Sequence, residues 1–157
     1  MDPNLKPYLE KHKIEYKIYS HPPVFTVEES KKIKLNISGT HTKCLFLKDE
    51  HSQFYLICLL ANKRLNTSLL RKKFNLRELY FASEEELKSG LNLTPGSVSI
   101  FGMIYAKSTY LIIDKDLWNA DAVGFHPNIN TSTIVLDHNN LEKFYNSLKT
   151  KKEIMKL

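Results

Sequence analysis

The sequence is poor in the residues that mark several large protein classes. It has two cysteines, five glycines and six prolines among 157 residues. Few prolines and glycines, with well-mixed charges on 25% of the residues, argue against a disordered or fibrous protein. Cys44 and Cys58 are too few for a disulfide framework and form no CxxC pair for zinc. We therefore expect them to be buried thiols.

Long apolar runs are also missing. The N-terminal sequence MDPNLKPYLEKHKIEY is charged and lacks the apolar stretch of a signal peptide. No other stretch approaches the roughly 20 apolar residues of a membrane-spanning helix. These features predict a cytoplasmic protein that does not enter a membrane.

The chain nevertheless has enough apolar residues for a core. They make up 42% of the sequence, and neither an internal repeat nor a linker divides it, so residues 1–157 are expected to form one domain. The net charge of +6 favours a polyanionic partner, although a basic surface also serves solubility.

Hydrophobic periodicity predicts more strands than helices, and they do not alternate strictly. Capping boxes mark helices that begin after Thr26 and Ser83, with Glu29 and Glu86 three residues on. The other expected helices cover 3–13, 67–75 and 139–149. The expected strands cover 14–20, 43–60 as a hairpin, 78–82, 108–116, 122–127 and 131–137. Residues 93–103 are expected to be a loop that leads into a strand, and the lysine-rich C-terminal end is expected to fray. This pattern predicts an α+β domain with a mixed, largely antiparallel, barrel-like sheet surrounded by helices.

Familiar catalytic motifs are absent. The chain has no HExxH, GxSxG, Walker or GxGxxG sequence, so we expect no metal site, no cofactor and no serine or cysteine nucleophile. Two residues stand out instead. Lys43 precedes an apolar strand, where its head either reaches water or forms a fixed cation for a phosphate. His126, in GFHPN, is either a structural histidine or a binding group on a loop.

Four motifs carry a resemblance to a known family. HPPVFTVEES, GTHTKCLFLKD, TPGSVSIFG and GFHPNINTSTIVL occur in this order, and the resemblance that they carry covers roughly residues 15–148. Together they resemble the prolyl-tRNA synthetase-associated (YbaK-like) editing domain family, whose members are trans-acting aminoacyl-tRNA deacylases. The chain is most similar to the free-standing members that hydrolyse alanyl-tRNA(Pro). The resemblance implies a deacylase whose partner is mischarged tRNA(Pro), with prolyl-tRNA synthetase as a second candidate partner.

The resemblance also implies a set of site residues. The expected catalytic residues are Lys43, which positions the 3′ end of the tRNA, and Gly96 and Ser97, whose backbone N–H groups face the substrate carbonyl. The expected substrate-binding residues are His21, Thr26, Cys44, Thr94, Pro95 and His126.

The sequence departs from the family pattern at three positions. Cys44, Asn92 and Ile100 stand where the family usually has asparagine, glycine and proline. These departures leave two alternatives open, namely a deacylase for cysteinyl-tRNA(Pro) and a module that binds tRNA ends without hydrolysing them. The oligomeric state is not predicted.

Overall fold

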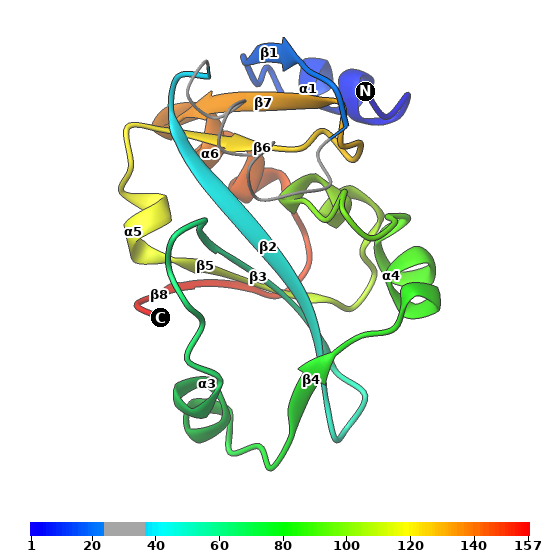
Figure 1. The fold of residues 1–157 in the computed structure, drawn as a ribbon, viewed down its shortest axis with the longest axis vertical. Coiled ribbons are helices and arrows are strands. Elements are labelled where there is room, and N and C mark those ends of the chain that lie inside the picture. The colour runs from blue at the N-terminus through cyan, green and yellow to red at the C-terminus, as the bar shows by residue number, and fades with distance from the viewer. Residues whose placement is uncertain (24–36) are drawn as a thin grey trace.

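The computed structural model describes residues 1–23 and 37–157 (Figure 1). The helices are α1 (Leu5–Lys11), α3 (Thr67–Phe74), α4 (Glu84–Leu91), the 3-10 helix η1 (Ile100–Tyr105), α5 (Lys115–Trp118) and α6 (His138–Ser147). The strands are β1 (Lys17–Ser20), β2 (Thr40–Asp49), β3 (Phe54–Leu60), β4 (Leu79–Phe81), β5 (Tyr110–Asp114), β6 (Ala122–Phe125), β7 (Ser132–Asp137) and β8 (Lys152–Met155). The predicted cap at Thr26 and Glu29 lies outside the described residues.

The eight described strands form one mixed sheet with the order β1-β7-β6-β2-β3-β5-β8, and β4 pairs with β2 as a side branch. The pairings β2–β6, β3–β5 and β5–β8 are parallel, and the other four are antiparallel. In Figure 1, β1, β7 and β6 lie at the top, β5 and β8 cross the middle, α3 and β4 lie at the bottom, and β2 runs from the top toward β4. The predicted α+β class and mixed sheet are confirmed.

The barrel-like closure of the sheet was a wrong prediction. The end strands β1 and β8 do not pair with each other among the described residues. Side chains from helices fill the larger hydrophobic core instead, where Leu9 of α1, Phe101 of η1 and Phe144 of α6 pack with residues of both halves of the sheet. These helices occupy the space that a closed barrel would need for its own inward-facing side chains.

Strand β2 borders two hydrophobic cores because successive strand residues point to opposite faces. Phe46 packs in the larger core, together with Cys58 and Leu56 of β3. Leu47 packs in a smaller core that lies under α3 and includes Leu70. The predicted hairpin of β2 and β3 is confirmed, with Leu45 paired to Ile57 in its antiparallel register.

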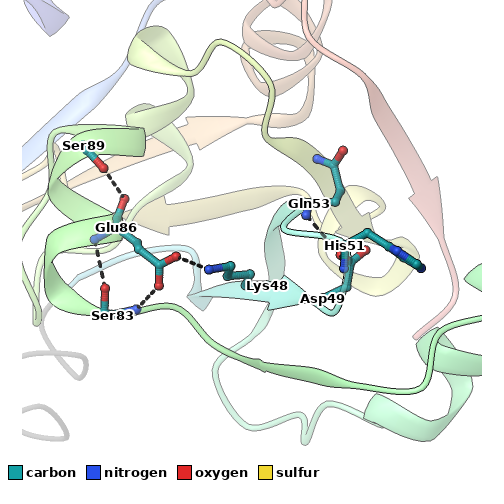
Figure 2. A network of polar contacts seen from close by, with 7 residues as sticks. All are labelled: Lys48, Asp49, His51, Gln53, Ser83, Glu86 and Ser89. Carbon is teal, nitrogen blue, oxygen red and sulfur yellow. Dashed lines mark hydrogen bonds and ion pairs between the residues drawn. The ribbon is translucent and has the colours of Figure 1, made fainter.

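Helix α4 is fixed at its N-terminus to the far end of β2 (Figure 2). Ser83 accepts from the Glu86 N–H and Glu86 accepts from the Ser83 N–H, which confirms the predicted capping box. The other carboxylate oxygen of Glu86 lies 2.7 Å from Nζ of Lys48 in β2. This contact raises the pKa of Lys48 and lowers the pKa of Glu86. The pair positions the helix that leads into the loop at residues 94–97.

Two segments differ from the predictions. Residues Ile100–Tyr105 form a 3-10 helix where a strand was expected, because Ser99 caps the turn by accepting from the Phe101 N–H. The C-terminal segment does not fray. Its residues Lys152–Met155 form β8, which pairs in parallel with β5 and buries Met155. No helix in the described ranges is long and apolar enough to cross a membrane.

Candidate functional site

Lys43 lies in β2 at the end where the strand meets β6. It is directly opposite Leu59 of β3, and its side chain is half-buried. By strand alternation it shares a face with Leu45, which packs against the smaller core. Cys44 belongs to the other face, where its sulfur lies 3.1 Å from that of Cys58. Lys43 and Cys44, although adjacent in the chain, therefore lie on opposite faces of β2.

Strands β2 and β6 bring the neighbourhoods of Lys43 and His126 together. His41 of β2 pairs with Gly124 of β6 in a parallel register, and the Thr42 hydroxyl donates to the Gly124 carbonyl over 2.6 Å. Lys43 is two residues after His41 within β2, so by strand alternation it belongs to the face of His41 and Gly124. His126 directly follows the end of β6, and its ring lies beside that of His21, which bonds Thr133 next to Gly124 on the same face.

Gly124 permits the close approach of the neighbouring strands. A Cβ at this position would lie 3.1 Å from Cγ2 of Thr133 on β7 and 3.9 Å from Nδ1 of His41 on β2. The first of these distances is tighter than ordinary contact. The absence of a side chain therefore keeps this part of the face flat between β7 and β2.

His21 and His126 lie beside each other on this face, with ring centroids 6.2 Å apart. His21 Nδ1 lies 2.9 Å from the Pro22 carbonyl, and its Nε2 lies 3.0 Å from the Thr133 hydroxyl. A carbonyl oxygen only accepts, so Nδ1 carries the proton in the neutral ring and Nε2 accepts from the hydroxyl. His126 Nδ1 likewise lies 3.2 Å from the Ser132 carbonyl. Both rings are thus oriented by the backbone around them.

The TPGS loop forms a tight turn after α4. The Ser97 N–H donates to the Thr94 carbonyl over 3.1 Å, and Gly96 has a φ of +86°. A proline followed by a residue with positive φ is the pattern of a type II turn. The turn uses the Ser97 N–H. Gly96 is exposed, and its N–H has no partner among the residues that the structure describes, so this amide is available as a donor.

The loop and the turn after β6 are connected through η1 and the N-terminal segment. The Phe101 ring of η1 packs 5.8 Å from that of Phe125, the residue before His126. The Asp2 carboxylate accepts from the Tyr105 hydroxyl at 2.6 Å and from Nδ2 of Asn128 at 2.9 Å. Burial raises the pKa of Asp2, but its hydrogen bonds outweigh that effect and lower the pKa overall. The ionised carboxylate therefore ties the end of η1 to the 126–128 turn.

The charge environment of Lys43 differs from that of other half-buried lysines. Lys48 is paired with Glu86, and Lys63 with Asp114 at 2.9 Å and with Asp116. The Lys152 ammonium donates to the Leu148 carbonyl. Within the described ranges, the Lys43 ammonium has neither a carboxylate partner nor a hydrogen bond. No side chain of residues 1–23 or 37–157 neutralises its charge, so the described part of the chain leaves the ammonium available to an anion.

The predicted site residues thus fall into separate groups. The sheet assembles Lys43, His126 and His21 on one face. The convergence of the 94–97 loop with them stays a prediction, because no atom lies within 4 Å of a Cβ built at Gly96. Thr26 lies outside the described residues, and Cys44 belongs to the core side of β2.

Two polar residues that contact this part of the sheet were missed in the sequence analysis. Thr133 bonds His21, and Thr42 bonds the backbone of Gly124. The contacts join residues that are 112 and 82 positions apart in the chain, and no local pattern in the sequence indicates them. A search of the described ranges finds no cluster of three or more histidine, cysteine, aspartate or glutamate side chains that could hold a metal ion.

Comparison with known proteins places this arrangement in a family. The aminoacyl-tRNA editing domain family matches residues 21–144. The prolyl-tRNA editing protein ProX of Acetoanaerobium sticklandii is 36% identical over 138 residues, which cover 86% of this chain and 84% of that protein. Prolyl-tRNA synthetase associated domain-containing protein 1 of Danio rerio is 28% identical over 144 residues, or 89% of this chain and 78% of that protein.

A solved structure supports the fold. A protein described as a candidate trans-editing enzyme for prolyl tRNA synthetase superposes with a TM-score of 0.73 at 17% identity, over 97% of each chain. Taken with the match over residues 21–144, these likenesses show that the chain belongs to the aminoacyl-tRNA editing domain family.

Proposed function

We propose that this protein is a trans-editing hydrolase that cleaves the ester bond of mischarged tRNA(Pro), with alanyl-tRNA(Pro) as its main substrate. The observation that carries the proposal is the ammonium of Lys43, which has no ion-pair partner among the described residues and belongs to the same face as two oriented histidines, in a chain of the editing family. The similarity to ProX, a prolyl-tRNA editing protein, supports the choice of tRNA.

Lys43 binds a phosphate at the 3′ end of the tRNA in this proposal. A lysine ammonium acts as a compact point charge for phosphate, and it does so best where no carboxylate competes for it. The half-buried position on β2 restricts the side chain, so less conformational entropy is lost when the phosphate binds. Lys43 thereby sets where the ester bond lies relative to the rest of the face.

Hydrolysis then follows from positioning and charge stabilisation. A water molecule attacks the ester carbonyl, and the carbonyl oxygen becomes negatively charged in the tetrahedral intermediate. The Gly96 N–H donates to this oxygen, because the turn leaves that amide exposed. One backbone donor of this kind contributes about 3 kcal/mol to the stability of a transition state. The leaving ribose oxygen takes up a proton, with the neighbouring ribose hydroxyl as the relay.

His126 and His21 bound the space for the aminoacyl side chain. Their rings are fixed by the Ser132 and Pro22 carbonyls and by Thr133, so they form a wall that does not readily move. A single methylene changes binding in an apolar pocket by only about 1 to 3 kcal/mol, so a rigid wall that rejects the larger proline ring is the more effective basis of selectivity.

The position of Cys44 weakens the case for a module that binds without hydrolysis. That alternative rested on cysteine replacing the usual asparagine beside Lys43. The Cys44 sulfur contacts Cys58 on the core side of β2, so the replacement removes no group from the face of Lys43. Removal of cysteine from tRNA(Pro) remains the second candidate activity, because it uses the same groups.

The test is a substrate panel. Alanyl-, cysteinyl- and prolyl-tRNA(Pro), each labelled in the amino acid, are incubated with the protein, and release of the amino acid is followed over time. We expect rapid release of alanine, slower release of cysteine and no release of proline above the spontaneous rate. Stable alanyl-tRNA(Pro) would refute the proposed substrate, and stability of all three esters would refute the hydrolase.

A further inference from the structure

The positive charge of this protein is concentrated in one short segment. Residues 63–77 contain six of the 23 lysines and arginines, including all three arginines of the chain, and contain no aspartate or glutamate. The remaining residues carry 17 basic side chains, the same number as the 17 acidic ones. The entire net charge of +6 therefore equals the charge of this segment, which consists of α3 and the residues on either side of it.

Three of these six basic side chains have a partner within the described part of the chain and three do not. Lys63 and Lys73 pair with carboxylates, and Arg71 donates to the Arg77 carbonyl and to the Ser68 hydroxyl. The others are Arg64, Lys72 and Arg77, all exposed. None of their cationic groups has an ion-pair or hydrogen-bond partner among the described residues.

Stabilisation of the helix explains only part of this charge. Arg71, Lys72 and Lys73 occupy the last turn of α3, where cations interact favourably with the helix dipole. Arg64 precedes the helix and Arg77 follows it, so neither gains from that effect. The helix dipole also gives no reason for the absence of acidic residues from the whole segment.

The basic segment begins beside the candidate site. The Ala61 N–H donates to the His41 carbonyl over 2.9 Å, so the chain leaves β3 next to the part of β2 that contains Lys43. It then runs to α3, whose Leu70 packs in the smaller core with Leu59, the residue opposite Lys43. Figure 1 shows this segment descending from the end of β3 to α3. Lys43 and α3 therefore belong to the same face of the sheet.

We propose that the surface formed by Arg64, Lys72 and Arg77 binds the sugar-phosphate backbone of the tRNA body while its 3′ end lies at Lys43. This inference rests on the proposed function for the identity of the RNA. The Glu50 carboxylate accepts from the backbone N–H of Arg77 over 2.8 Å and not from its guanidinium, so all three cationic groups lack a carboxylate partner among the described residues. The phosphates of a nucleic-acid backbone are the ligand that fits such exposed cations, because each contact releases condensed counterions. The contacts involve no bases, so they strengthen binding of the tRNA without selecting its sequence.

The experiment measures binding separately from hydrolysis. Fluorescence anisotropy with labelled, uncharged tRNA(Pro) is recorded from 50 to 200 mM salt for the wild type and for the triple variant Arg64→Gln, Lys72→Gln, Arg77→Gln. The matched control variant, Lys11→Gln, Lys107→Gln, Lys149→Gln, removes the same charge from three exposed lysines elsewhere. Hydrolysis of a short aminoacylated CCA oligonucleotide, which lacks the tRNA body, is measured in parallel.

We expect the triple variant to bind tRNA about tenfold or more weakly at 50 mM salt, with the slope of log K against log salt concentration reduced by about 2 to 3. The control variant should keep most of the wild-type affinity, and both variants should hydrolyse the oligonucleotide at the wild-type rate. If tRNA binding were weakened equally in the triple variant and the control variant, net charge alone would explain the effect and the inference would be overturned. Unchanged tRNA binding by the triple variant would overturn it as well. A wild type that binds tRNA but hydrolyses no ester would refute the proposed function while leaving the binding surface in place.

Discussion

Replacing Lys43 with methionine removes one ammonium group from β2 and leaves an unbranched side chain of similar reach. Lys43 has no carboxylate partner within the described ranges, so the substitution leaves no buried anion behind. The free energy of unfolding should therefore change by less than about 0.5 kcal/mol. Any larger functional effect then reports on substrate binding and not on folding.

The expected functional loss follows from the charge and its exposure. Two unit charges 4 Å apart attract by about 4 kcal/mol at an effective dielectric constant of 20. Half-burial and screening by salt reduce this value toward the roughly 1.5 to 3 kcal/mol of a hydrogen bond to a charged group. That range corresponds to a fall in kcat/KM of about 10- to 150-fold. Because a phosphate remote from the ester is bound equally in the ground and transition states, most of the loss should appear in KM.

The assay is deacylation of alanyl-tRNA(Pro) over a range of tRNA concentrations, with a urea unfolding curve for each variant. Lys115→Met is the matched control, because Lys115 is exposed at the start of α5 and has no ion-pair partner in the described part of the chain. A Lys43→Met variant with wild-type KM and kcat would refute the reasoning. A fall in kcat at unchanged KM would instead place the ammonium at the reacting ester.

Three further predictions concern the elements that support the site. Gly96→Ala should lower the free energy of unfolding, measured in a urea curve, by about 1 to 2 kcal/mol, because an L-residue is strained at a φ of +86°. Gly96→Asn should lower it less, because asparagine tolerates positive φ better than alanine. Equal losses in the two variants would argue against strain at this turn. Asp2→Asn should flatten the dependence of the free energy of unfolding on pH below 3.8, because hydrogen bonds, including that from Tyr105, hold the pKa of Asp2 in the folded protein below this value. The stabilisation by the carboxylate is present above pH 3.8 and is lost as the pH falls through the folded pKa. Urea unfolding between pH 5 and pH 2 measures this effect, and curves that match the wild type would contradict the role of the carboxylate. Cys58→Ser should lower the free energy of unfolding by about 1 to 3 kcal/mol, because it buries a hydroxyl in an apolar core. Cys44→Ser should lower it less, because Cys44 is only half-buried. A larger loss for Cys44→Ser than for Cys58→Ser would contradict this packing.

Features set by residues close together in the chain were predictable from the sequence. The capping box of α4 depends on Ser83 and Glu86, three residues apart, and both hydrogen bonds are present. The hairpin of β2 and β3 follows from two apolar runs around one polar turn. The TPGS turn follows from the fixed φ of proline and the positive φ that glycine permits. In each case the sequence contains both partners of the interaction within a few residues.

Features that depend on distant residues were decided by the tertiary structure. The amphipathic signal of β8 is weak among its lysines, and the strand forms because β5 offers an open edge about 40 residues earlier in the chain. The register of β2 against β6 joins Thr42 to Gly124, which are 82 residues apart, and so sets Lys43 and His126 on one face. Side-chain type and local spacing do not encode such pairings. They arise because strands gain backbone hydrogen bonds only in the register that also buries the apolar residues of both.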